Sequence, residues 1–274
     1  MTGGGRQLTI AIAVAAIVAT GCGGGSESTT STSTGSPVRV TFESPSGQAN
    51  ANGAYLLKAN RVPFLMNSFA TAFQVPDQLT VRGVNGFGSG PFFNPKDDTI
   101  TFPYGFANLV FQTERQLNPN GSGKQIGTAV GATDSFILAH EFTHALIAIY
   151  DLPVLGKEED AADELATLIL LKADNGGEYV LDAAQFWYGL SRLTQKVPTL
   201  SDYADVHSLD LQRAYAMVCD LAGSSQAAYR RVAQLKILPA SRLTSCPAEY
   251  KQHVDSFEQV LGSHLQGTLS LAAG

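Results

Sequence analysis

The sequence HEFTH, residues 140–144, lies inside an apolar run that extends from residue 136 to residue 150. Residues four apart on an α-helix lie one above the other on the same face. His140 and His144 can therefore present two imidazole nitrogens to one metal ion, and Glu141 lies where its carboxylate reaches a water bound to that ion. Two zinc ligands and a general base on one helical turn are typical of a catalytic zinc site.

The alternative is a structural reading of the same helix, with two buried histidines and Glu141 at its solvent edge. The sequence contains only five histidines, and two of them fall at the spacing that a metal site requires. This spacing favours the metal site.

A catalytic zinc needs a third protein ligand and an open fourth position. The acidic stretch EEDAADE, residues 158–164, opens the next predicted helix. Glu159 and Asp163 are four apart and share a face, which predicts Glu159 as the ligand and Asp163 as an acceptor for the second ring nitrogen of a ligand histidine. Glu158 is the main rival for the ligand role. Acids in a first helical turn also complement the helix dipole, which is the alternative explanation for Glu158 and Asp160.

The pattern of the remaining chain predicts an α+β fold, with a small N-terminal sheet packed on the metal helix and a mostly helical C-terminal half. The metal helix is expected to begin at Thr133 or Asp134, after a polar loop over residues 118–127, and to end near Asp151. Strands are predicted over residues 38–42, 79–84 and 99–104. Other helices are predicted over residues 55–73 with a kink at Pro63, 106–117, 158–173, 179–194, from 207 or 208 to 221, and 247–265.

The N-terminal segment reads as an export signal. One positive charge, Arg6, precedes an apolar core over residues 8–18, and small residues then lead to Cys22. We predict a signal peptide over residues 1–22 that ends in a lipobox, a flexible Gly/Ser/Thr tether over residues 23–37, and one domain over residues 38–274. Lipidation of Cys22 would anchor the protein to a membrane of the bacterial cell envelope; the alternative is secretion with Cys22 removed or unmodified.

Export to an oxidising compartment would allow the two remaining cysteines to form a disulfide. Cys219 and Cys246 are expected to form a disulfide in an oxidising compartment, since neither belongs to a closely spaced metal-binding pair. The net charge of −6 and the absence of a basic cluster interleaved with aromatics argue against a nucleic-acid partner. His253 and His264 are predicted to be surface residues.

The clusters together resemble those of the gluzincin metallopeptidases. HEFTH followed by EDAAD at residues 159–163 is similar to the pattern of the CAAX-type membrane peptidases and their minimal soluble relatives. The resemblance implies a zincin-like fold, with Glu159 as the third zinc ligand and Asp163 as the support of a histidine. His207 and Arg213 match a downstream histidine and arginine of those enzymes, which implies that His207, with Arg213, donates to the transition-state oxyanion. Taken alone, His207 would more often be a surface histidine.

LPVLGKEEDAAD at residues 152–163 and HSLDLQR at residues 207–213 also resemble an uncharacterised bacterial family of metallopeptidases, over roughly residues 95–260. This chain departs from the membrane enzymes in lacking their transmembrane helices and the proline after the downstream histidine. In zincin-like enzymes an edge strand borders the cleft and pairs with extended substrate. Residues 94–104 are the candidate for that strand, and the alternative is one arm of a hairpin.

The predicted function is that of a zinc-dependent metalloendopeptidase with one Zn²⁺ per chain and a protein or peptide substrate, acting outside the cytoplasm. Glu141 would be the general base. One alternative is a non-catalytic zinc lipoprotein with a structural or peptide-binding role. Another is hydrolysis of a non-peptide amide such as a cell-wall crosslink, since the same ligands and base serve both reactions.

Overall fold

The computed structural model describes residues 37–75, 79–194, 197–267, 269 and 271. The predicted signal peptide, Cys22 and nearly all of the predicted tether lie outside the described residues. Within them, no helix is long and apolar enough to cross a membrane.

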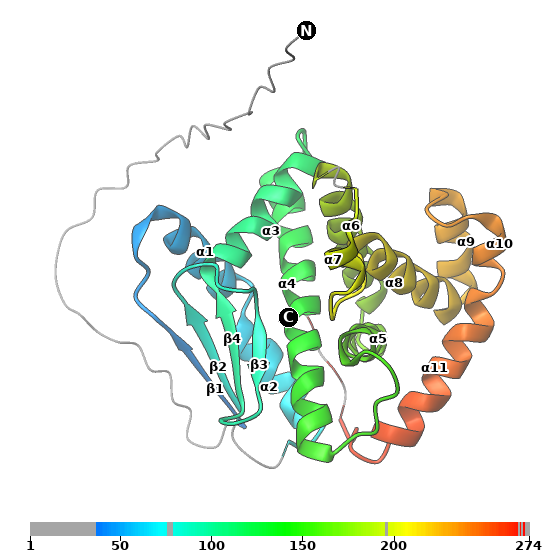
Figure 1. Cartoon of the computed structure of the whole chain (residues 1–274), viewed down its shortest axis with the longest axis horizontal. Coiled ribbons are helices and arrows are strands. Elements are labelled where there is room, and N and C mark those ends of the chain that lie inside the picture. Colours follow the sequence, from blue (N-terminus) through cyan, green and yellow to red (C-terminus); the bar gives the residue numbers. More distant parts are fainter. Residues whose placement is uncertain (1–36, 76–78, 195–196, 268, 270, 272–274) are drawn as a thin grey trace, which may run out of the picture.

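The N-terminal half consists of a four-stranded sheet and three helices (Figure 1). Its elements are β1 (Val38–Phe42), α1 (Gly47–Ala59), α2 (Val62–Ala72), β2 (Leu79–Val84), β3 (Phe92–Asn94), β4 (Thr99–Pro103) and α3 (Tyr104–Leu117). The strand order is β1-β2-β4-β3, in which β1, β2 and β4 are parallel and β3 is antiparallel to β4. Val40 pairs with Val81, which pairs with Ile100, and all three are buried, so one apolar row crosses the parallel strands.

The metal helix is α4 (Gly123–Tyr150), which is 28 residues long and begins ten residues earlier than predicted. Ser122 and Gln125 form a capping box: the Ser122 hydroxyl accepts from the Gln125 backbone N–H, and the Gln125 side chain accepts from the Ser122 backbone N–H. The predicted loop is therefore correct only over residues 118–122, and the predicted start of the helix at Thr133 or Asp134 is wrong. The side chains of Thr133 and Asp134, which lie within α4, are both buried. The predicted end near Asp151 agrees with the structure, where Asp151 is the left-handed C-cap.

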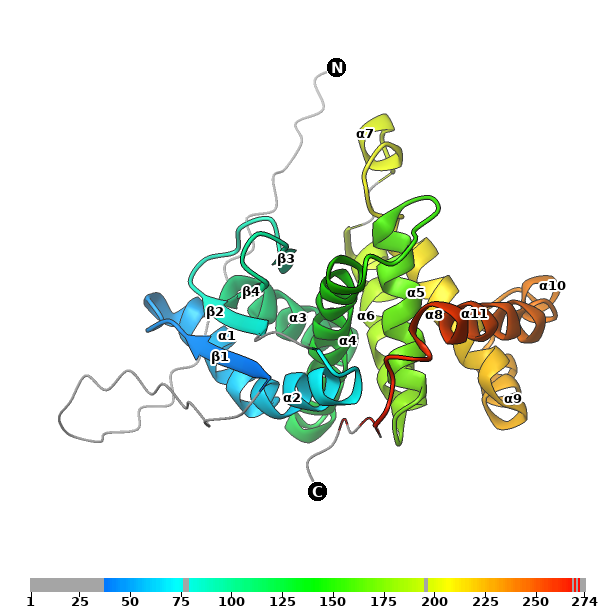
Figure 2. The ribbon, with the colours of Figure 1, turned by 90° about the horizontal axis from the view of Figure 1, so that it is seen from below.

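The C-terminal half is helical, as predicted. Its elements are α5 (Glu158–Leu171), α6 (Gly176–Thr194), α7 (Leu200–Tyr203), α8 (Asp210–Ser224), α9 (Gln226–Leu235), α10 (Ala240–Leu243) and α11 (Cys246–Leu261). Figure 2 shows α4 between the two halves, with the sheet on one side and α5, α6 and α8 on the other. Helix α4 contacts β3, α2 and α3 as well as α5 and α6, so its polar residues at 140–144 lie where the halves meet.

Two further differences concern the N-terminal half. The single helix predicted over residues 55–73 is divided into α1 and α2 at Asn60 and Arg61, because Arg61 is left-handed with φ of 55° and Pro63 stands in the first turn of α2. The strand predicted over residues 94–104 is not the edge of the sheet. Strand β4 is paired on both sides and forms an antiparallel hairpin with β3, as in the alternative prediction. The edge strand is β3, two of whose three residues precede the predicted segment.

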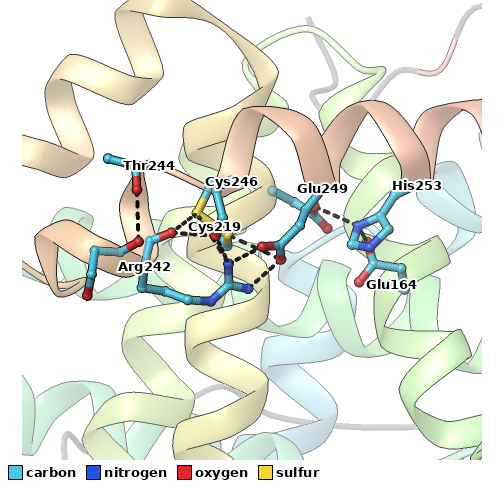
Figure 3. Close-up of a disulfide and its surroundings, with 10 residues drawn as sticks. Glu164, Cys219, Arg242, Thr244, Cys246, Glu249 and His253 are labelled. Atoms are coloured by element: carbon cyan, nitrogen blue, oxygen red, sulfur yellow. Dashed lines mark hydrogen bonds and ion pairs between the residues drawn. A yellow bond between two sulfur atoms is a disulfide. The ribbon is translucent and has the colours of Figure 1, made fainter.

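The predicted disulfide between Cys219 and Cys246 is present and joins α8 to the first turn of α11 (Figure 3). It closes a segment of 27 residues that contains α9 and α10. In the chain-entropy model a loop of this length stabilises the folded state by roughly 3 kcal/mol.

Candidate metal centre

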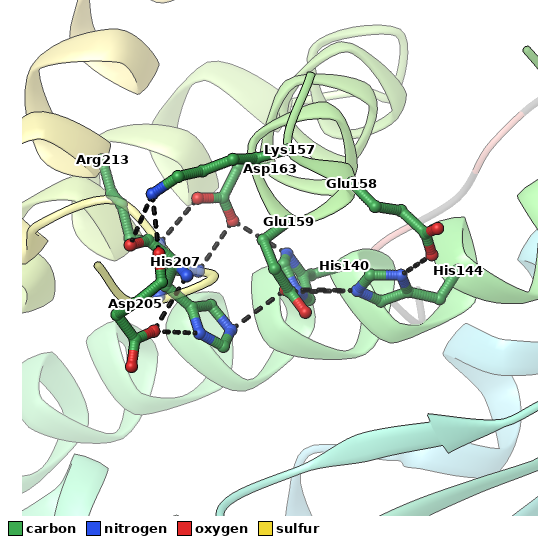
Figure 4. Close-up of polar contacts among 9 residues, drawn as sticks. All are labelled: His140, His144, Lys157, Glu158, Glu159, Asp163, Asp205, His207 and Arg213. Atoms are coloured by element: carbon green, nitrogen blue, oxygen red, sulfur yellow. Dashed lines mark hydrogen bonds and ion pairs between the residues drawn. The ribbon is translucent and has the colours of Figure 1, made fainter. Parts of the chain in front are cut away.

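Helices α4 and α5 pack against each other and bring the HEFTH and EEDAADE clusters together (Figure 4). Nε2 of His140 lies 3.0 Å from Oε2 of Glu159, and Nε2 of His144 lies 3.3 Å from the same oxygen. The two Nε2 atoms are themselves 3.3 Å apart. Three donor atoms therefore meet at one point, two from a single turn of α4 and one from the first turn of α5.

The outer nitrogens of the two histidines face different carboxylates. Nδ1 of His140 lies 2.8 Å from Oδ1 of Asp163, and Nδ1 of His144 lies 2.8 Å from Oε1 of Glu158. Glu158, the rival for the ligand role, is thus placed outside the point at which the Nε2 atoms meet. Each histidine has one nitrogen turned inward and the other held by an acid, which fixes the ring orientation.

His207 reaches the same point from the loop that precedes α8. Its Nε2 lies 3.0 Å from Oε2 of Glu159, and its ring stacks at 6.3 Å from that of His140. Asp205 accepts a hydrogen bond from the His207 backbone N–H and lies 3.2 Å from its Nδ1. Lys157 donates to the backbone carbonyls of Asp205 and His207, which fastens this loop to the segment before α5.

Arg213 lies one helical turn into α8 and is buried. Its guanidinium donates two hydrogen bonds to Asp163, from Nε at 2.6 Å and from Nη2 at 2.7 Å, and it lies over the Trp187 ring at 3.9 Å. Arg213 therefore forms a direct pair with Asp163. Arg213 contacts the centre through the carboxylate that holds His140.

Comparison with known proteins bears on this centre. Residues 43–261 match a family described as "Putative metallopeptidase". The chain belongs to this family. No curated protein and no solved structure matches the chain. The match includes every residue of the centre described above, and a peptidase of this description implies a bound metal ion.

The donor atoms fit such an ion. Zinc binds imidazole nitrogen and carboxylate oxygen at about 2.0–2.2 Å, so two ligands of a tetrahedral ion lie about 3.3 Å apart. The separations among His140, His144 and Glu159 are 3.0, 3.3 and 3.3 Å. Two histidines and one carboxylate are also a ligand set of catalytic zinc.

The electrostatics of the centre suit a cation. Hydrogen bonds from His140, His144 and His207 hold the pKa of Glu159 far below its usual range. Burial opposes the charged form of His140, yet its contacts with Asp163 and Glu159 raise its pKa to about 9. The charge of Arg213 and the contact with His140 outweigh burial and lower the pKa of Asp163 to about 2. Protonated histidines and Arg213 thus supply the positive charge that balances the carboxylates of Glu159 and Asp163.

Glu141 lies beside the three donors and is 5% exposed. Burial raises its pKa above the usual carboxylate value, although the neighbouring histidines oppose this. A carboxylate that is less acidic than usual is a better proton acceptor near neutral pH, which suits a general base.

Two cavities share Glu141 and His207 in their walls. The larger, of about 630 Å³, extends toward α6, and its walls combine charged residues with the apolar Phe136, Ile137 and Trp187. The smaller, of about 480 Å³, lies under the edge strand and is lined by residues of and around β3, among them Pro91, Phe92, Phe93 and Pro95. Space for an extended ligand is therefore present on both sides of Glu141.

Sequence reasoning missed two features of this region. Strand β3 lay in a Gly- and Pro-rich segment, and its three residues are too few to show alternation. His253, predicted to be a surface residue without acidic partners, contacts Glu164 and Asp220 from two other helices. That prediction is wrong because sequence spacing reveals only partners on the same helix. His264 stacks on the ring of Tyr150.

Proposed function

We propose that this metallopeptidase family member is a zinc-dependent endopeptidase that hydrolyses peptide bonds of protein or peptide substrates. The observation that carries the proposal is the meeting of His140 Nε2, His144 Nε2 and Glu159 Oε2 at ligand spacing. Glu141 lies in the wall of both cavities beside this point. A metal site, a base and room for a chain on both sides are the parts that endopeptidase chemistry needs.

His140, His144 and Glu159 would hold the zinc ion. When bound, zinc supplies a Lewis acid and lowers the pKa of water toward neutrality. Asp163 and Glu158 keep the two ligand histidines oriented through their Nδ1 atoms.

The protein side chains supply the proton transfers. Glu141 accepts a proton from the attacking water and returns it to the leaving nitrogen of the peptide. His207, held by Asp205 and by its loop, donates a hydrogen bond to the oxygen of the substrate carbonyl as negative charge develops there. Arg213 positions Asp163, which in turn holds His140.

The site of action follows from the N-terminal sequence. A signal peptide that ends in a lipobox at Cys22 would place the protein outside the cytoplasm, on a lipid anchor in the bacterial cell envelope. The tether over residues 23–37 would then separate the catalytic domain from the membrane.

A second candidate function rests on His207. Because its Nε2 lies 3.0 Å from Glu159 Oε2, it can complete a site of four protein ligands. Zinc sites closed by four protein ligands are structural. The protein would then be a non-catalytic zinc lipoprotein that binds peptides or has a structural role.

The test combines zinc content with hydrolysis. The full chain and its Glu141→Gln variant would be assayed for zinc per chain and for cleavage of unfolded protein and of a mixed peptide library. We expect about one zinc at this centre in both proteins and a loss of cleavage of about 10²–10⁴-fold in Glu141→Gln. Glu43→Gln, which changes an exposed glutamate of a surface pair, is the matched control. Cleavage retained in Glu141→Gln would remove the base assignment, and zinc without cleavage in the parent would favour the non-catalytic candidate.

A further inference from the structure

A second group of metal-ligating side chains lies apart from the first and joins three helices. It consists of Glu164 on α5, Asp220 on α8 and His253 on α11, whose donor atoms all lie within 4.8 Å of one another. Nδ1 of His253 lies 2.9 Å from Oδ1 of Asp220 and also contacts Oε1 of Glu164. Figure 3 shows His253 and Glu164 facing each other next to the disulfide.

The charges of this group do not balance. Asp220 is 1% exposed, and its Oδ2 is buried with no hydrogen-bond partner in the described part of the chain. One imidazolium cannot neutralise two carboxylates. Arg242, in the same region, is paired with Glu249 through two hydrogen bonds and is not available to the group. His253 compensates the buried Asp220, which leaves the partly exposed Glu164 carboxylate without a positive charge of its own. A further positive charge would therefore stabilise the group.

Two forms of positive charge can fill this need. The first is a proton on one carboxyl group: burial raises the pKa of Glu164 to about 8, and the neighbouring Asp220 contributes to this rise. The second is a divalent cation between the three donors. The imidazole-to-carboxylate distance of 2.9 Å is a few tenths of an ångström shorter than the separation of about 3.3 Å between two ligands of a tetrahedral zinc ion, so a small outward shift of these side chains would admit the ion.

We propose that Glu164, Asp220 and His253 bind a second divalent ion of the Zn²⁺ class. One imidazole nitrogen with two carboxylate oxygens suits zinc, whose sites combine such ligands, and the buried Asp220 Oδ2 accepts no hydrogen bond from the described donors. This site is separate from the peptidase centre: Asp163 joins α5 to Arg213 and His140, whereas the next residue, Glu164, faces α11.

The position of the group indicates a structural role for this ion. Asp220 follows Cys219 on α8, and His253 lies two turns beyond Cys246 on α11. The disulfide and the ion would therefore join α8 to α11 at two neighbouring positions. Glu164 adds α5, the helix that carries Glu159. The ion would therefore hold α11 and α8 against the helix that supplies the third ligand of the peptidase centre.

The experiment counts ions on the full chain, purified in detergent and freed of metal. The protein would be loaded with Zn²⁺, passed through a metal-free column and analysed for zinc by mass spectrometry. We expect two ions in the parent, one in Asp220→Asn and one in Glu159→Ala. His264→Gln, which changes a histidine outside both groups, should retain two. Chelation of the ion that Glu159→Ala retains should lower the thermal midpoint of that variant.

Each outcome has one meaning. One ion in the parent that disappears in Glu159→Ala would show that Glu164, Asp220 and His253 hold a proton instead, and the proposal would be overturned. One ion that survives in Glu159→Ala but disappears in Asp220→Asn would support this site and remove the proposed peptidase centre. Should Asp220→Asn fail to fold by circular dichroism, Glu164→Gln and the count in the parent decide the matter.

Discussion

Arg213 and Asp163 form a buried, two-pronged ion pair that joins α8 to α5 directly behind His140. The guanidinium donates to both carboxylate oxygens at 2.6 and 2.7 Å, and both residues are 8% exposed. The same carboxylate lies 2.8 Å from His140 Nδ1. Asp163 therefore connects a helix–helix contact to a predicted zinc ligand. A substitution at Arg213 should lower the affinity for zinc although Arg213 is not itself a ligand.

Arg213→Gln should weaken both folding and zinc binding. Removing one partner of a buried ion pair costs about 3–5 kcal/mol, because the other charge stays buried without compensation. Loss of a residue that supports a ligand typically lowers metal affinity about 10–100-fold. Urea unfolding of the metal-free protein and zinc titration against a chelator measure the two effects.

The matched control is Arg231→Gln. Arg231 also forms a two-pronged pair, with Glu178, but both side chains are about half exposed. Pairs of that kind contribute about 0–1 kcal/mol. Equal losses of stability in the two variants would mean that burial does not strengthen the Arg213 pair.

Glu158 and Glu159 are adjacent, yet the structure gives them different partners. Glu159 Oε2 meets the Nε2 atoms, whereas Glu158 Oε1 faces the outer nitrogen of His144. Glu159→Ala should therefore abolish zinc binding at the peptidase centre. Glu158→Ala should keep the ion with affinity lowered by at most about 10–100-fold. If zinc at this centre is retained in Glu159→Ala and lost in Glu158→Ala, then Glu158 is the third ligand and Glu159 is not.

His207 distinguishes the two candidate functions. If it donates to the oxyanion, His207→Ala keeps the zinc and lowers the turnover rate about 10²–10³-fold. If it is a fourth ligand, the variant loses zinc affinity in proportion to its loss of activity. Zinc affinity and kcat measured on the same preparation separate these cases, with His264→Ala as the control histidine. We expect the first result.

The metal centre was predictable where helical periodicity alone places the residues. His140 and His144 share a turn, and Glu159 and Asp163 share another, so local spacing selected all four. The packing of α4 on α5 was not predictable, since it depends on contacts between residues far apart in sequence. For the same reason the group of Glu164, Asp220 and His253 was missed, because its members come from three helices and no local pattern links them.

The fold was predictable to a similar extent. Strands over residues 38–42 and 79–84 matched, because apolar residues alternate there, whereas the first five residues of α4 were taken for loop and the helix was expected to begin ten residues too late. Their glycines and polar residues concealed a capping box at Ser122 and Gln125. The consequence is that Asp134, predicted as a candidate start of the helix, is instead a fully buried acid within it.

Asp134 should make the protein less stable as pH rises. Its Oδ2 accepts from the Asn60 side chain at 2.7 Å, and its Oδ1 is buried with no hydrogen-bond partner among the described residues. Burial outweighs the bond from Asn60 and raises the pKa of Asp134 to about 8, whereas the pKa of an unfolded aspartate is about 3.9. Between those values the unfolded state releases its proton and the folded state keeps it, so unfolding becomes easier by up to about 1.4 kcal/mol per pH unit.

Asp134→Asn removes this titration while keeping the size and polarity of the side chain, and the Asn60 amide can turn to accept from it. The variant should match or fall slightly below the parent near pH 4 and exceed it by a margin that grows up to about pH 8, then stays constant. Urea unfolding of metal-free protein at several pH values measures the margin, because other groups with raised pKa values, such as Glu114, cancel between the two proteins. Asp174→Asn, at an exposed position, should show no such growth. A constant difference between parent and Asp134→Asn across this range would mean that Asp134 is already ionised in the folded protein.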